Sequence, residues 1–222
     1  MPTRPLRPTL VGERVYLRAP RRTDAVPFMA AARASRRLHA SWVTAPDTRE
    51  AFDRYIARFG GRRTPTRVHA GYLALRRDDD SLVGVFNFSE IVRGAFQNAY
   101  LGYYGFRANA GKGLMKDGLG LALDAAFGPL GLHRVEVNIQ PGNVRSIGLV
   151  TGMGFAQEGF SRGYLRIAGR WRDHLRFAML AEDWQAQRQA APARSLTASG
   201  SSPRRRGSSV STISRRRAPP PR

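Results

Sequence analysis

One strand-turn-helix segment in the middle of the chain constrains the fold more than any other feature. Residues 97–104 have the alternating pattern of a strand, a turn containing Gly111, Lys112 and Gly113 follows, and residues 113–127 have the Leu and Ala pattern of a helix. Glycine lets the backbone approach a ligand closely. The first N–H groups of a helix have no internal partners and lie at the positive end of the helix dipole. The segment therefore predicts an anion-binding turn, although the same glycines also suit an ordinary tight connection.

Two familiar nucleotide-binding motifs do not fit this turn. A Walker loop ending at Gly111 and Lys112 needs Gly where Phe106 stands and Ser or Thr where Gly113 stands. A dinucleotide fingerprint that starts at Gly111 needs a small residue where Lys116 stands. The spacing alone therefore leaves the identity of the anion open.

The other periodic segments alternate between helical and extended patterns. We expect a first helix that begins at Thr23 or Asp24, with Pro27 in its first turn, where proline is tolerated. A hairpin that turns around Ala168 and Gly169 closes the pattern. This order predicts an α/β fold with a mixed sheet. The other expected strands cover residues 10–18, 69–75, 82–88, 134–139, 164–167 and 175–180, and the expected helices end near residue 38 or cover 47–59 and 144–153.

Length and composition favour one folded domain. A chain of 222 residues with 42% hydrophobic composition can bury one substantial core, and a second full domain would leave both undersized. The sequence has no Cys, which excludes disulfides, thiolate zinc sites and cysteine nucleophiles. The first residues lack a continuous apolar run, and no stretch approaches the roughly 20 apolar residues that span a bilayer. We therefore expect a cytoplasmic protein.

Positive charge is concentrated toward the C-terminal end. The formal net charge is +21, and residues 185–222 contain nine Arg and no acidic residue. This stretch has hardly any large apolar residue, so burial cannot offset its ordering entropy. We expect a flexible N-terminus over 1–9, a folded domain over 10–184 and a disordered basic tail over 185–222. The charge favours a polyanionic partner such as ribosomal RNA, while a coding bias toward Arg explains it equally well.

The segment around the glycine turn resembles the acetyl-CoA loop of the GNAT acetyltransferase superfamily. A strand over 101–105 leads into ANAGKG at 108–113 and then into a helix. The stretch NVRS at 143–146, the Gly-Phe pair after it and the final hairpin are similar to the superfamily's Asn-x-x-Ser helix start, Gly-Phe corner and last strands. Ala108 stands where the loop usually has Gln or Arg, which removes one side chain but leaves the backbone. The resemblance covers residues 10–184 and implies splayed central strands, with acetyl-CoA as co-substrate and no metal.

A narrower resemblance is carried by the stretches GVFNFSEIVRGAFQNAYLGY, GKGLM, PGNVRS and GRWRDH. Together they are similar to the ribosomal-protein alanine N-acetyltransferases. This likeness implies that the N-terminal α-amine of a ribosomal protein attacks the thioester directly in a ternary complex. Related enzymes of the same build acetylate small amines or antibiotics, so these acceptors remain an alternative. A non-catalytic ribosome- or RNA-associated protein that keeps the fold and uses the basic tail is a third reading.

The resemblance also implies cofactor-binding positions. Main-chain groups of Tyr103 and Gly105 would pair with the pantetheine arm of CoA. Asn138 and Asn143 would bind the cofactor or order the site, and Asn143 is also a natural helix N-cap. The loop that would hold the pyrophosphate through its N–H groups contains Ala108, Gly111, Lys112, Gly113 and Leu114.

Three residues are expected to move protons. Ser146 resembles the family's residue near the CoA sulfur, and Tyr164 is the competing acid. Glu90, which follows a predicted strand, would take the amine proton directly or through water, unless it is an exposed strand-end carboxylate. Glu136 is a second candidate base or a structural ion-pair partner. Trp42 lies where related enzymes shape the acceptor cleft, or it is an ordinary core aromatic. The four His residues show no spacing typical of a metal site or a triad, and we expect each to be structural.

Overall fold

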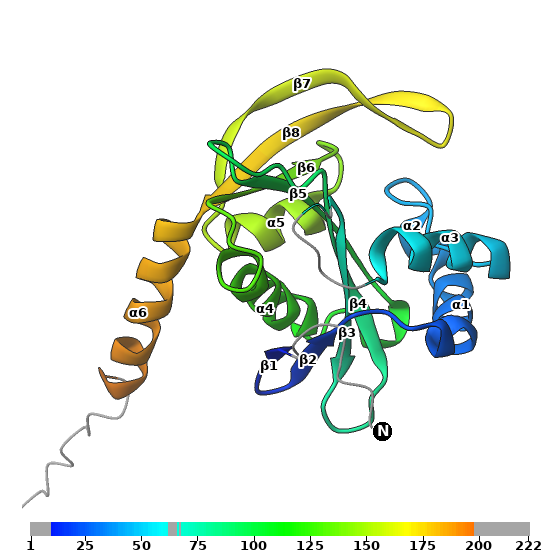
Figure 1. The fold of residues 1–222 in the computed structure, drawn as a ribbon, viewed down its shortest axis with the longest axis horizontal. Coiled ribbons are helices and arrows are strands. Elements are labelled where there is room, and N and C mark those ends of the chain that lie inside the picture. Colours follow the sequence, from blue (N-terminus) through cyan, green and yellow to red (C-terminus); the bar gives the residue numbers. More distant parts are fainter. Residues whose placement is uncertain (1–9, 62–65, 67, 198–222) are drawn as a thin grey trace, which may run out of the picture. The chain divides into compact units, whose positions relative to one another are not determined.

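The computed structural model describes residues 10–61, 66 and 68–197. In these residues one sheet runs in the order β1-β2-β3-β4-β5-β6-β8-β7, and only the neighbours β5 and β6 are parallel. The predicted α/β fold with a mixed sheet is therefore confirmed (Figure 1). The strands are β1 (Leu10–Val11), β2 (Val15–Arg18), β3 (Ala70–Arg76), β4 (Leu82–Ser89), β5 (Asn98–Gly105), β6 (Arg134–Ile139), β7 (Ala156–Ile167) and β8 (Arg170–Leu180).

Helices cover both faces of this sheet. On one face, Phe86 of the sheet, Leu119 of α4 and Val150 of α5 belong to the larger buried cluster. On the other face, Phe28 of α1 and Phe52 of α3 belong to a second cluster. Figure 1 shows the two groups of helices on opposite sides of the central strands. The helices are α1 (Ala25–Ala34), α2 (Arg36–His39), α3 (Arg49–Phe59), α4 (Leu114–Phe127), α5 (Val144–Thr151) and α6 (Ala181–Thr197).

Two expected elements near the start of the chain are interrupted. The first expected strand is a hairpin, because the Gly12 N–H donates to the Val15 carbonyl at 2.9 Å and closes a turn between β1 and β2. The first expected helix ends at Ala34, where the buried Ser35 hydroxyl donates back to the Ala31 carbonyl at 2.7 Å. Such bonds from a serine to the carbonyl four residues earlier bend helices, and the chain continues as the separate turn α2.

The final hairpin is longer than expected. Its turn is confirmed, since Ala168 and Gly169 have φ of 47° and 79°, the pair of positive values that a type I′ hairpin turn requires. β7, however, already begins at Ala156. Among the described residues this strand pairs only with β8 and lies at the sheet edge, so most of its side chains are exposed and give no alternating apolar pattern.

The central strands β5 and β6 separate along their length. They pair only over three residues each, and the last paired positions are Tyr100 and Glu136. Beyond that point β5 continues beside β4 as far as Gly105, and β6 continues beside β8 as far as Ile139. The predicted splayed central strands are therefore present, and we call the region between the unpaired halves of β5 and β6 the opening.

The predicted end of the folded domain falls within a helix. α6 continues through Gln185, where the sequence places the start of the tail. Trp184 fixes the first turn of this helix, because its Nε1 donates to Asp124 Oδ1 at 2.9 Å and the side chain is buried. The predicted flexible segment 1–9 and the part of the predicted tail over 198–222 lie outside the described residues.

Candidate active site

Part of the β5 backbone faces the opening. The Phe106 N–H donates to the Val83 carbonyl of β4 at 2.8 Å. Because the N–H and C=O groups of successive strand residues point to opposite sides, those of Gly105 and Tyr103 point away from β4 and toward the opening. These are the main-chain groups that the sequence expects to pair with a pantetheine arm.

His39 makes a contact with β5 that the sequence did not predict. Its Nε2 lies 2.8 Å from the Gly105 carbonyl oxygen, and its ring stacks edge-on against Tyr104. A carbonyl only accepts hydrogen bonds, so Nε2 carries the proton in this arrangement. The side chain is buried, and α2 thereby fixes the last carbonyl of β5. Only long-range packing reveals this contact, because 66 residues separate the two partners.

The chain after α2 reaches the far side of the opening. The Gln140 side chain, which follows β6, donates to the Ser41 carbonyl at 3.0 Å. Trp42 lies against Gly142, so that a Cβ on this glycine would be 3.4 Å from the indole ring. Trp42 therefore lies beside the residues that follow β6, and its place near an acceptor stays a prediction.

The glycine turn has the geometry expected of an anion-binding loop. Gly111 and Gly113 have φ of 76° and 75°, and α4 begins at Leu114 directly after the second glycine. The Leu114 side chain is buried in the core, so its N–H is the group that it can offer to a ligand. Ala108 and Lys112 are exposed on the same loop. The Lys112 ammonium donates to the Ala108 carbonyl at 3.1 Å and so closes the loop upon itself.

Three predicted residues meet on the α4 and α5 face of the opening. The hydroxyls of Tyr103 and Ser146 lie 2.6 Å apart and share a hydrogen bond. The Asn143 side chain accepts from the Ser146 N–H at 3.2 Å, which confirms Asn143 as the N-cap of α5. Burial raises the pKa of Tyr103 to about 12. Its phenol therefore stays protonated near neutral pH and can donate a hydrogen bond.

A second polar group lies on the opposite face of β6. The Asn138 amide nitrogen donates to Glu136 Oε1 at 3.1 Å and to the Tyr164 hydroxyl at 3.3 Å. Val137, between them, points into the buried cluster under α4, so Glu136 and Asn138 share the other face. Burial, together with a hydrogen bond to Tyr100, raises the pKa of Tyr164 to about 12. Asn138 Oδ1 is buried and has no hydrogen-bond partner among the described residues.

The predicted proton-transfer residues thus form two groups on opposite faces of the sheet, and Glu90 belongs to neither. Its carboxylate lies 3.7 Å from Arg58 Nη2 and its side chain is 60% exposed. Its backbone has φ of 49° at the end of β4. Glu136, in contrast, is 8% exposed and occupies the last paired position of β6, where the strands begin to diverge. Glu136 Oε2 also lies 3.5 Å from Arg134 Nη2, so the structural ion pair that was the expected alternative for Glu136 is present. The sequence favours Glu90 over Glu136 as the base, and this ranking stays a prediction.

The described part of the chain has no helix long and apolar enough to cross a bilayer. Those residues also contain no group of three or more His, Asp or Glu side chains placed to hold a metal ion.

Comparisons with known proteins agree with the fold and the glycine loop. The sequence profile of the acetyltransferase (GNAT) domain matches residues 14–156. The chain is 41% identical over 107 residues to the ribosomal protein uS5-alanine N-acetyltransferase of Escherichia coli, and this alignment covers 48% of the chain and 55% of the relative. In general the chain spans 55–62% of the length of the curated relatives that it matches.

Two solved structures have the same fold. The ribosomal-protein-S5-alanine acetyltransferase from Vibrio fischeri superposes with a TM-score of 0.68 at 22% identity, over 80% of this chain and 99% of that one. RimJ from Mycobacterium smegmatis, in complex with CoA-disulfide, superposes with a TM-score of 0.69 at 26% identity, over 81% of this chain and 90% of that one. The family profile covers more than half of the sequence, and the splayed strands and the glycine loop lie where that family is expected to have them. The chain belongs to the GNAT acetyltransferase family.

Proposed function

We propose that the protein transfers an acetyl group from acetyl-CoA to the N-terminal α-amine of a protein, such as a ribosomal protein, in the cytoplasm. The observation that carries this proposal is the opening between β5 and β6, which has proton-donating hydroxyls on one face and a buried carboxylate on the other. The name of the relative from Escherichia coli, an alanine N-acetyltransferase acting on a ribosomal protein, supports the choice of acceptor.

The cofactor would bind along the β5 side of the opening. The outward-facing backbone groups of Tyr103 and Gly105 would pair with the pantetheine amides. The N–H groups of Gly111 to Leu114, at the positive end of α4, would hold the pyrophosphate. A main-chain N–H near Tyr103 would stabilise the oxyanion that forms when the thioester carbonyl is attacked.

The amine would enter from the face that carries Glu136 and Asn138. An α-amine with a pKa near 7.8 is roughly 10% neutral at pH 7, whereas a lysine amine near 10.4 is less than about 0.1% neutral. A modest base therefore suffices for the α-amine. We infer that Glu136 accepts its proton, since this carboxylate lies beside the Asn138 amide in the buried part of the opening. The exposed Glu90 is the alternative base and would act through water.

One proton leaves the amine and one reaches the sulfur, so the proton taken by the base must return to the proton donor through solvent. The amine nitrogen bonds to the thioester carbon, the C–S bond breaks, and the amine proton passes to the base. The departing thiolate would receive a hydrogen bond or a proton from the Ser146 hydroxyl, which can donate to it when Tyr103 in turn donates to Ser146 Oγ. Tyr164, held protonated by its raised pKa, is the alternative donor.

The test is thiol release by the purified protein with acetyl-CoA and a panel of acceptors. The panel contains peptides that begin with Ala or Ser, the same peptides with a blocked N-terminus, and free small amines. Turnover on the open peptides alone is the expected result. Turnover on small amines alone would replace the proposed acceptor. RNA binding without acetyl-CoA binding would instead support a non-catalytic partner of the ribosome.

A further inference from the structure

Asn109 lies in the middle of the glycine loop but its side chain points into the protein. It is 4% exposed, unlike the neighbouring Ala108 and Ala110. Its amide nitrogen donates to the Ser81 hydroxyl at 3.1 Å and to the Leu82 carbonyl at 3.0 Å. The loop between β5 and α4 is therefore tied to the turn between β3 and β4, which is almost 30 residues away in the sequence.

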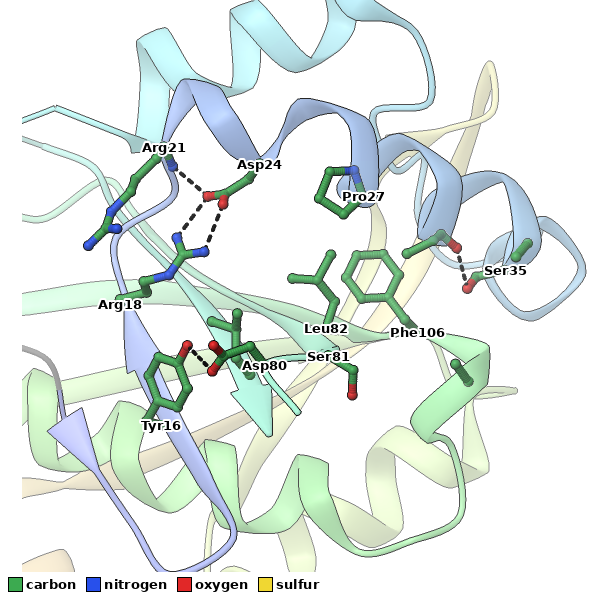
Figure 2. A pocket seen from close by; sticks show the side chains of 14 residues that line it. Tyr16, Arg18, Arg21, Asp24, Pro27, Ser35, Asp80, Ser81, Leu82 and Phe106 are labelled. Atoms are coloured by element: carbon green, nitrogen blue, oxygen red, sulfur yellow. Dashed lines mark hydrogen bonds and ion pairs between the residues drawn. The ribbon is translucent and has the colours of Figure 1, made fainter. Parts of the chain in front are cut away.

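That turn is itself held in place. Asp80 has a φ of 55°, and the Tyr16 hydroxyl donates to its carboxylate at 2.8 Å. Asp79 accepts from the Ser81 N–H at 2.9 Å, and hydrogen bonds from Ser81 hold the pKa of Asp79 below its usual value. Figure 2 shows Asp80, Ser81 and Leu82 together on one wall of a cavity of about 480 Å³. Asn109 is thus hydrogen-bonded to a turn that is itself held by other hydrogen bonds.

The other end of the Asn109 side chain faces the loop. Its carbonyl oxygen accepts from the Lys112 ammonium at 3.3 Å, and the same ammonium reaches the Ala108 carbonyl. Lys112 stands between Gly111 and Gly113, which have positive φ and no side chains to hold them. Glycine has more conformational freedom to lose than any other residue, so an unattached loop would have to be ordered by its ligand. A loop that is already ordered avoids that cost.

We propose that Asn109 is a positioning residue for the phosphate-binding loop. It does not touch the cofactor. Its amide joins the β3–β4 turn to Lys112 and so holds the N–H groups of Gly111 to Leu114 in the orientation that receives the pyrophosphate. This inference rests on the proposed use of acetyl-CoA, and it concerns only how the loop is kept ready for it.

The experiment compares two acetyl donors that differ in the phosphates. Acetyl-CoA carries the pyrophosphate, and S-acetyl-pantetheine presents the same thioester and pantetheine arm without it. For Asn109→Ala we expect kcat/KM with acetyl-CoA to fall by about 10-fold to 100-fold, through KM, because all three side-chain hydrogen bonds of Asn109 are lost. With S-acetyl-pantetheine the kcat/KM of the same variant should differ from that of the wild type by less than about twofold. Ser81→Ala, which leaves the bond to Leu82, should show a smaller change in the same direction.

Asn98→Ala is the matched control. Asn98 is also a buried asparagine, 1% exposed, at the start of β5, and its side-chain oxygen has no partner among the described residues. Its variant should keep the wild-type ratio between the two donors. If the role of Asn109 were purely structural, Asn109→Ala would lower kcat/KM equally with both donors. That result, or an unchanged KM for acetyl-CoA, would overturn the inference. If the wild-type protein has the same kcat/KM with S-acetyl-pantetheine and with acetyl-CoA, the loop binds no phosphate and the inference also fails. If the wild type uses neither donor, the proposed function itself is wrong.

Discussion

The hydrogen bond between Tyr103 and Ser146 gives a prediction that can be worked out from the structure. Tyr103→Phe keeps the ring against Phe86, at a centroid distance of 6.1 Å, and removes the hydroxyl. The hydroxyl makes two contacts with Ser146, 2.6 Å to Oγ and 3.2 Å to the carbonyl. At about 0.5–1.5 kcal/mol for each bond, the free energy of unfolding should fall by about 1–3 kcal/mol. For a domain of this size that corresponds to a loss of about 2–12 °C in Tm.

The effect on catalysis should be separate from this loss of stability. General acid catalysis contributes about 10²-fold to 10⁴-fold, and a thiol with a pKa near 8.5 is a good leaving group that needs only the low end of this range. We therefore expect kcat to fall by about 10-fold to 100-fold at a temperature where the variant is fully folded. Acetyl-CoA binding should change little, because the Tyr103 backbone is kept.

A double-mutant cycle decides whether the two hydroxyls act together. If Tyr103 orients the proton that Ser146 donates, then Tyr103→Phe, Ser146→Ala and the double variant should all have similar kcat, since removing one partner already disables the pair. Single-turnover rates of thiol release give the rate of the chemical step for each variant, and thermal unfolding gives its stability. The pairing would be refuted if the two single-variant reductions in kcat multiplied in the double variant. It would also be refuted if all three variants were folded and had wild-type kcat.

Three further predictions concern the opening and its loop. Glu136→Gln should lower kcat/KM for the peptide by about 10²-fold or more, while the kcat/KM of Glu90→Gln should stay close to that of the wild type. The reverse ranking, measured as initial rates, would make Glu90 the base. Gly113→Ala forces a Cβ into a φ of 75° and to 3.2 Å from an Arg14 nitrogen, so calorimetry should show weaker acetyl-CoA binding, and unchanged affinity would contradict the loop assignment. In a pH profile, kcat/KM should rise about tenfold per unit below the amine pKa near 7.8 and then level off. Because burial raises the pKa of Tyr164 from 10.0 to about 12, a fall in rate before pH 10 would show that this phenol is not the proton donor.

The glycine loop could be predicted because its signals are local. Two glycines, the end of a strand and the start of a helix all occur within a few residues, and the structure has them at Gly111, Gly113 and Leu114. The N-cap role of Asn143 is local for the same reason. Buried strands such as β4 and β5 were also readable, since their apolar residues mark them.

The parts that were missed depend on distant contacts or on exposed strands. β7 lies at a sheet edge, so its exposed side chains hide its start at Ala156. The bonds that assemble the site join Tyr103 with Ser146 and Asn138 with Tyr164, pairs whose spacing carries no periodic signal. His39 was treated as an ordinary structural residue, and only the folded chain shows that it holds the end of β5. Candidate site residues could thus be named one by one from the sequence, and their roles stay predictions, whereas their grouping on two faces of the sheet could not be predicted.

Hydrogen–deuterium exchange with and without acetyl-CoA tests most directly whether the opening between β5 and β6 is the cofactor site. We expect acetyl-CoA to slow exchange in peptides that cover Tyr103 to Gly105 and Gly111 to Leu114, because these N–H groups would donate to the cofactor. Exchange in β2 and β3 should stay the same. Protection that appears elsewhere, with unchanged exchange along β5 and the glycine loop, would contradict the proposed binding site and the mechanism built on it.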